Sequence, residues 1–292
     1  MKTHALFLLV AAVAMSFNVG AAQDTRSDKQ VSDQVIAKQR QNLAKHTHHK
    51  EFGPQSPRDI DSPAGNTSVL FNPAPAYTDM NLCNIHFHKN AEHKGGEFTK
   101  YAGNGDGYGH ATGYQYSGEL TKAELKDVDY EVCPSAHDSL KPGDTIEVHY
   151  VHSTAKIEPG HTLGSCLSES IKNPQLRVET QVYVLVNDSN ALDFAKLTEH
   201  GLKDGLHQAF NIPNNTGFPV SYAGSTTGPS YNEKGSPFQV TWSVRPRVAK
   251  VNIATVGKWC KTNTFNEYYA HGVRNLVTNP DLLSPIMEAP SW

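Results

Sequence analysis

Short runs of alternating apolar and polar residues, separated by Pro, Gly and Asn, fill the sequence from residue 52 onward. Alternation with a period of two is typical of strands that bury one face. The segments that carry it are residues 81–88, 145–152, 176–186, 238–244 and 248–254. The pattern predicts a β-rich domain with many loops. Because no repeat or shift in composition divides the chain, we expect one domain over residues 51–292.

Three segments depart from the strand pattern. Residues 192–206 have the spacing of a helix, and the glycine-rich residues 103–116 predict a long loop. Residues 23–50 are polar and carry a thin apolar stripe at helical spacing. We therefore expect a helix over residues 28–45, within a loosely attached N-terminal arm.

The first residues have the composition of an export signal. Lys2 precedes an apolar run over residues 5–17, and the small residues at 19–22 suit cleavage by a signal peptidase. The run is shorter than the roughly 20 residues that a membrane-spanning helix needs. We expect a signal peptide over residues 1–22, a periplasmic or secreted mature protein, and no stable membrane anchor after cleavage.

The overall composition is that of a folded protein of moderate charge. Of its 292 residues, 38% are hydrophobic and 19% are charged, which excludes a disordered chain. The formal net charge of −3 argues against nucleic acid as a partner. Cysteines in an oxidising compartment predict two disulfides, with three pairings open, and the absence of a CxxC spacing argues against a zinc ribbon. The four cysteines are Cys83, Cys133, Cys166 and Cys260.

Histidines place the candidate chemistry in two of the expected strands. His86 and His88 lie two residues apart, so both side chains point to one face of the first strand. Glu147 and His149 share a face of the second strand for the same reason. Three imidazoles from neighbouring strands suit a zinc ion and leave the open position of a catalytic site. Asn84 and Glu147 each precede a histidine by two residues, where an acceptor can hold its second ring nitrogen.

Several stretches resemble, in their order along the chain, the signatures of the δ-class carbonic anhydrases, a family related to the α-type carbonic anhydrases. Each stretch is short, but together they span residues 53–276. Those similar to the α-type enzymes are GPQSPRDID at 53–61, HFH at 86–88, AEH at 91–93, EVHYVH at 147–152, YAGSTT at 222–227, VTW at 240–242 and GVRNL at 272–276. Those similar to the δ class are CNIHFHKNAEH at 83–93, GDTIEVH at 143–149, LRVETQVYVLVND at 176–188 and GSTTG at 224–228.

The resemblance implies both a fold and an activity. The fold is an α+β, mainly β domain around a large, twisted, mostly antiparallel sheet with short peripheral helices. The activity is the reversible hydration of carbon dioxide to bicarbonate and a proton by a zinc-bound hydroxide on His86, His88 and His149. Glu147 would orient His149, and Asn84 would orient His86. Carbon dioxide and bicarbonate are then the partners, and a homodimer is compatible with the family.

The resemblance also implies roles for groups around the metal. In the family, a threonine called the gatekeeper places its hydroxyl between the zinc-bound hydroxide and a glutamate, here Glu92. Alignment from Tyr222 without a gap assigns this role to Thr227, whereas alignment on the double threonine assigns it to Thr226. A further set would line an apolar pocket for carbon dioxide. Its members are Val151, Val182, Val240 and Trp242.

One departure from the α-type pattern bears on proton transfer. Residues 66–80, between the first signature and the first histidines, contain no histidine, so the α-type proton shuttle has no counterpart there. The shuttle stays unassigned, and an alternative function is a catalytically silent zinc-binding module for adhesion or metal handling. The three ligand histidines and both neighbouring carboxylates favour the enzyme. Candidates for proton transfer are His110, His161, His46, His48 and His49.

Overall fold

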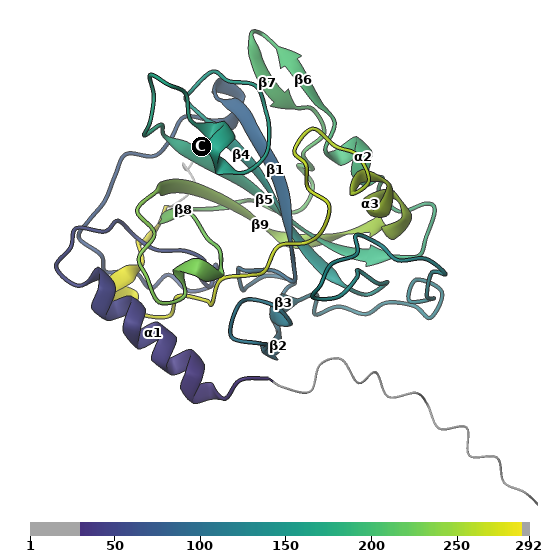
Figure 1. The fold of residues 1–292 in the computed structure, drawn as a ribbon, viewed down its shortest axis with the longest axis horizontal. Helices are drawn as coiled ribbons and strands as arrows, with labels where there is room; N and C mark the ends of the chain where they lie inside the picture. Colours follow the sequence, from purple (N-terminus) through teal and green to yellow (C-terminus); the bar gives the residue numbers. More distant parts are fainter. Residues whose placement is uncertain (1–29, 288–292) are drawn as a thin grey trace, which may run out of the picture.

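The computed structural model describes residues 30–287, and its centre is a six-stranded sheet (Figure 1). The strands run in the order β1-β4-β5-β9-β8-β10, and neighbours are antiparallel except β5 and β9. The expected mainly β, mostly antiparallel architecture is confirmed. Within residues 30–287, no helix has the length and apolarity needed to cross a membrane. The expected signal peptide over residues 1–22 lies outside the described residues.

Four strands of the central sheet, β1, β4, β5 and β9, lie where the sequence predicted strands, and β8 and β10 were not predicted. Their bounds are β1 Asn81–Lys89, β4 Thr145–Ser153, β5 Leu176–Val186, β8 Val220–Ser225, β9 Gln239–Asn252 and β10 Ile286–Met287. The two hairpins are β2 Lys100–Asn104 with β3 Thr112–Gln115, and β6 His200–Lys203 with β7 Leu206–Ala209. The α-helices are α1 Asp33–Thr47, α2 Phe194–Leu197 and α3 Ile253–Trp259. The 3₁₀ turns are η1 Tyr77–Asp79, η2 Leu163–Cys166, η3 Pro229–Tyr231 and η4 Pro280–Leu282.

The central strands are buried on both faces, and the alternation of side chains divides the interior into two apolar cores. Phe87 of β1 and Tyr150 of β4 belong to the first core. Val151 of β4 and Trp242 of β9 belong to the second. Since His149 has the same parity as Val151, the candidate metal ligands lie on the face of the second core.

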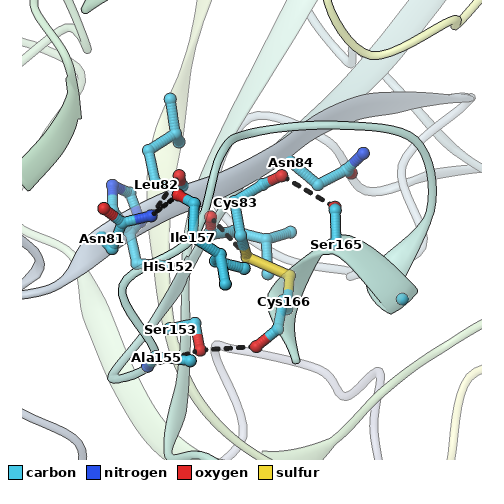
Figure 2. Close-up of a disulfide and its surroundings, with 12 residues drawn as sticks. Asn81, Leu82, Cys83, Asn84, His152, Ser153, Ala155, Ile157, Ser165 and Cys166 are labelled. Atoms are coloured by element: carbon cyan, nitrogen blue, oxygen red, sulfur yellow. Dashed lines mark hydrogen bonds between the residues drawn. A yellow bond between two sulfur atoms is a disulfide. The ribbon is translucent and has the colours of Figure 1, made fainter. Parts of the chain in front are cut away.

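Two disulfides settle the pairing that the sequence left open: Cys83 with Cys166, and Cys133 with Cys260. The first ties β1 to η2, and the Ser153 hydroxyl donates a hydrogen bond to the Cys166 carbonyl beside it (Figure 2). The second ties Cys133 to the residue that follows α3. Each bond restricts a long loop of the unfolded chain, an effect of about 2–4 kcal/mol.

Two hairpins replace segments for which the sequence predicted other structures. Only α2 is helical within residues 192–206, and β6 and β7 follow it. They are joined by Asp204 and Gly205, both with positive φ, as a two-residue hairpin turn requires. The expected long loop over residues 103–116 instead contains the end of β2 and all of β3.

The two strands expected over residues 238–254 form one continuous strand, β9. The pairing of β9 with β5 shifts register between Thr180 and Val182, opposite Val244 and Val248. Pro246 lies in this bulge, where its missing N–H interrupts no regular ladder bond. Proline usually ends a strand, but the bulge accommodates Pro246 inside β9.

The N-terminal arm is not loosely attached, contrary to expectation. α1 buries Leu43 against the C-terminal segment. Gln39 Nε2 donates to the Gly107 carbonyl at 2.8 Å, and Arg40 Nε donates to the Leu276 carbonyl at 3.1 Å. The thin apolar stripe is therefore supplemented by polar contacts to loops that the sequence pattern did not place nearby.

His152 of β4 offers a test of the cost of charging a buried histidine. Its Nδ1 donates to the Tyr150 carbonyl at 3.0 Å, and burial lowers the pKa of His152 from 6.5 to about 3. Below pH 6.5 the unfolded chain therefore binds a proton that the folded protein excludes, and stability falls as the pH falls. Between pH 7 and pH 4.5 we expect this residue to lower the free energy of unfolding by about 2–3 kcal/mol.

Urea unfolding of the wild type and of His152→Asn at both pH values measures this contribution. The variant should lose stability at both pH values but show a smaller difference between them. An equal pH dependence in the two proteins would contradict the prediction.

Candidate metal centre

Three histidines from two adjacent strands converge on one face of the sheet. His86 of β1 lies opposite His149 of β4 in the antiparallel register, and His88 lies two residues further along β1 on the same face. The ring centroids are 5.0 Å apart for His86 and His149, and 5.3 Å apart for His86 and His88. For His88 and His149 the separation is 4.7 Å. Strand register thus brings together the three ligands suggested by the sequence.

Each of these rings is held at its outer nitrogen by an oxygen acceptor. The contacts are His86 Nδ1 with Asn84 Oδ1 at 2.6 Å, His88 Nδ1 with the Gly272 carbonyl at 2.9 Å, and His149 Nε2 with Glu147 Oε1 at 2.6 Å. Carbonyl and carboxylate oxygens only accept, so each outer nitrogen carries the ring proton. In the neutral rings, each inner nitrogen is consequently left with a lone pair.

The inner nitrogens have the arrangement of metal ligands. His86 Nε2 and His149 Nδ1 lie 3.2 Å apart, and His88 Nε2 is buried without a hydrogen-bond partner among the described residues. Lone pairs that face one another repel unless a cation lies between them. Two nitrogens bound at 2.0–2.1 Å to one tetrahedral zinc ion are about 3.3 Å apart. The donor set therefore fits zinc.

Burial keeps these imidazoles neutral. It lowers the pKa of His88 to about 4, and together with repulsion from His149 it lowers the pKa of His86 well below its usual range. Burial also lowers the pKa of His149, although the hydrogen bond to Glu147 acts in the opposite direction. Neutral rings are the form that a metal ion requires of its histidine ligands.

Glu147 connects the centre to the interior of the protein. Its Oε1 accepts from His149 and, at 2.8 Å, from His93 Nδ1, while its Oε2 accepts the His93 backbone N–H at 3.1 Å. The far nitrogen of His93 lies 2.7 Å from the Tyr222 hydroxyl. Burial alone would raise the pKa of Glu147, but His93 and His149 outweigh it and lower the pKa well below its usual range. Glu147 thus remains a charged acceptor that fixes the His149 ring.

The two candidate gatekeeper threonines differ in their contacts. Glu92 Oε2 lies 3.8 Å from His88 Nε2, on the side of the inner nitrogen of that ring. Burial raises the pKa of Glu92, and the nearby Thr227 hydroxyl acts in the opposite direction. The Thr226 hydroxyl instead pairs with Ser236 Oγ at 2.5 Å. The contacts therefore favour Thr227 as the threonine between the centre and Glu92.

The three histidines line a cavity of about 660 Å³ that is apolar on one side. Of the predicted pocket residues, Val151, Val240 and Trp242 line this cavity. Val182 does not line it: it lies opposite Glu147 on β5 and is buried in the second core. Val182 shares the parity of Val178 but lies four residues further along β5, opposite Glu147 and not opposite Val151. Further apolar lining residues, which the sequence did not indicate, are Leu163, Leu176 and Val178.

The histidines considered for proton transfer lie in different places. His110 lines the cavity, whereas the remaining four candidates do not line it. His161 is exposed, and His46 near the end of α1 accepts the Gly235 backbone N–H at 3.2 Å. Among these candidates, His110 alone lies on the wall of the cavity.

Three residues of the C-terminal segment belong to the site but were not identified from the sequence. Gly272 supplies the carbonyl that holds one ligand ring, and Arg274 donates its backbone N–H to Glu92 Oε1 at 2.6 Å. His271 stacks on His86 with ring centroids 5.2 Å apart. Gly272 and Arg274 contact the site with backbone atoms, and the type of side chain at a position does not reveal such contacts. The weakly matching stretch GVRNL was the only indication that this segment reaches the site.

Comparison with a family model identifies a relationship for most of the chain. The model of the delta carbonic anhydrases matches residues 77–255, which include β1, β4, β5 and β9. No curated protein matches the chain.

Two solved structures show a distant likeness. An alpha-carbonic anhydrase from Thermovibrio ammonificans, in complex with the inhibitor sulfanilamide, is 17% identical, with a TM-score of 0.29 over 80% of this chain and 87% of that one. An alpha-carbonic anhydrase from Photobacterium profundum is 16% identical, with a TM-score of 0.29 over 88% of this chain and 98% of that one. At such TM-scores, neither likeness carries an argument about the site.

Substitutions of His149 and of its acceptor Glu147 distinguish the residue that binds the metal from the residue that orients the ligand ring. We expect His149→Ala to remove the bound metal, because it deletes one of three converging lone pairs. Glu147→Gln keeps an acceptor oxygen but loses the charge, and should weaken metal affinity about 10–100-fold. Competition with a chromophoric chelator measures the zinc affinity of both variants. Wild-type zinc affinity in His149→Ala would exclude that residue from the ligand set.

Proposed function

The chain belongs to the delta carbonic anhydrase family, and on that premise we propose that it hydrates carbon dioxide reversibly at a zinc ion held by His86, His88 and His149. The observation that supports this most strongly is the cluster of three imidazoles, in which the inner nitrogens of His86 and His149 lie 3.2 Å apart while an acceptor fixes the outer nitrogen of each ring. When bound, zinc supplies a Lewis acid that lowers the pKa of water to about 7, for which carbonic anhydrases are the standard example.

Thr227 would orient the oxygen that attacks carbon dioxide. In this role its hydroxyl proton would be directed to the nearby Glu92 carboxylate, and its oxygen would offer only lone pairs to the cavity that it lines. An O–H group in the cavity must then donate to Thr227, and its own lone pair is turned away from the threonine. Such positioning aligns the nucleophile before the substrate arrives.

The apolar wall would hold the substrate without hydrating it. Carbon dioxide is uncharged, and side chains such as Val151 and Trp242 exclude water while they contact it. The product is an anion, which the same wall solvates poorly. The wall therefore favours binding of the substrate over retention of the product.

We also propose that the mature protein works outside the cytoplasm. Residues 1–22 have the composition of a signal peptide, and the described chain carries two disulfides with no free cysteine. Both features suit an oxidising compartment.

Stopped-flow measurement of carbon dioxide hydration, with zinc content determined on the same sample, tests the function. We expect activity that disappears with a chelator and returns with added zinc. Full zinc occupancy without hydration above the buffer rate would instead indicate a silent zinc-binding module. His200→Asn, on the hairpin outside the cavity, is the matched control and should retain wild-type activity.

The neighbouring threonines provide a paired test of the orienting hydroxyl. Thr227→Val should lower kcat/KM about 10–100-fold, because it removes the group that links Glu92 to the cavity. Thr226→Val removes a hydroxyl that pairs with Ser236, and should lower stability more than kcat/KM. Initial rates and thermal unfolding of both variants measure the difference. The opposite ranking of the two kcat/KM values would assign the role to Thr226.

A further inference from the structure

A second group of potential metal ligands lies away from the three-histidine centre. Asp106, His110 and His137 each place a ligand atom within 4.8 Å of the others, and none of them belongs to the centre described above. His110 and His137 line the same cavity as the centre. We propose that these three residues form a second site, which binds a divalent transition-metal ion at the wall of the cavity.

The loop that carries Asp106 and His110 is tightly organised. Asp106 Oδ1 accepts the backbone N–H groups of Tyr108 at 2.7 Å and His110 at 3.1 Å, which leaves Oδ2 without a hydrogen bond in the described part of the chain. Gly105 has a φ of +58°, and a side chain there would collide with the His110 carbonyl. Gly109 has a φ of +97° and lies against the Val273 carbonyl. The carboxylate is therefore fixed by one oxygen, and its other oxygen remains for a ligand.

The segment that carries His137 is fixed independently. The disulfide from Cys133 to Cys260 holds it at one end. At the other end, Lys89 Nζ of β1 contacts Asp138 Oδ2 at 3.1 Å and donates to the Ser139 carbonyl at 3.2 Å. Two separately anchored segments thus present their histidines to each other, which reduces the entropy lost when both bind one ion.

The chemistry of the group suits a borderline transition metal. The His110 and His137 rings lie face to face, with centroids 3.4 Å apart and planes 5° from parallel, and their ring nitrogens bond to no other group of the described protein. Burial and the facing His137 lower the pKa of His110, which favours the neutral ligand form. Two imidazoles and one carboxylate prefer zinc, nickel or copper over calcium or magnesium.

Coordination by both rings requires one of them to leave the stack, because a metal ion binds in the plane of an imidazole. His137 is exposed and has room to turn, whereas His110 is half-buried against Gly272. An ion held there would narrow the cavity that leads to the three-histidine centre.

Zinc stoichiometry tests this site without reference to activity. The full mature protein is dialysed against buffered free zinc at rising concentration, and bound zinc is measured by mass spectrometry. We expect about two ions per chain in the wild type and about one in His110→Asn/His137→Asn. Asp106→Asn keeps an oxygen for the Tyr108 and His110 backbone groups, so its loop should stay folded while its second-site affinity falls at least several-fold.

His48→Asn/His49→Asn is the matched control. These residues also form a close pair, with ring centroids 3.7 Å apart, but they belong to none of the ligand groups found among the described residues. The control should still bind about two ions per chain. The proposal is wrong if the His110 and His137 variant binds as many zinc ions as the wild type, or if the control loses an ion to the same extent as that variant. Circular dichroism of each variant identifies any loss caused by unfolding.

Discussion

Three imidazoles packed close together, each with an unprotonated nitrogen, are the constraint on which the rest of the site depends. Lone pairs held this close repel, so each ring must be fixed from behind by an acceptor that cannot give up a proton. Glu147 fixes one ring from the same strand, and Asn84 fixes another in the same way. The third acceptor is the Gly272 carbonyl, from a segment distant in sequence. Burial then keeps the rings neutral and ready for a cation.

Segments from both ends of the chain contribute to the support of this centre. Arg274 is buried, and its guanidinium donates to the Ser56 carbonyl at 2.6 Å and to Gln55 Oε1 at 3.1 Å. Its backbone N–H donates to Glu92, so one residue joins the first sequence signature to the carboxylate beside the centre. The helix α1 also holds this region together, because Gln39 hydrogen-bonds both to Gly107 of the glycine-rich loop and to Asn275 of the C-terminal segment. The arm is therefore part of the domain's framework.

Errors in the sequence-based interpretation have identifiable physical causes. The pair Asp204 and Gly205 forms a tight hairpin turn, but the helical spacing around it concealed this local signal. The sequence pattern predicted two strands on either side of residues 245–247, yet a bulge accommodates Pro246 within the single strand β9. The stripe of α1 is too thin for a purely apolar interface, and hydrogen bonds to distant loops, which periodicity does not report, complete its attachment.

The sequence by itself determined the four long strands β1, β4, β5 and β9 apart from the continuity of β9, the face on which the candidate histidines lie, the ligand candidates with their acceptors in the same strand, and the resemblance to a family. These follow from local periodicity, because strand side chains alternate whatever the rest of the chain does. Only the tertiary structure decided the disulfide pairing, the different contacts of Thr226 and Thr227, and the burial of Val182 away from the cavity. Those features depend on strand order and on contacts between residues far apart in sequence, which local periodicity does not report.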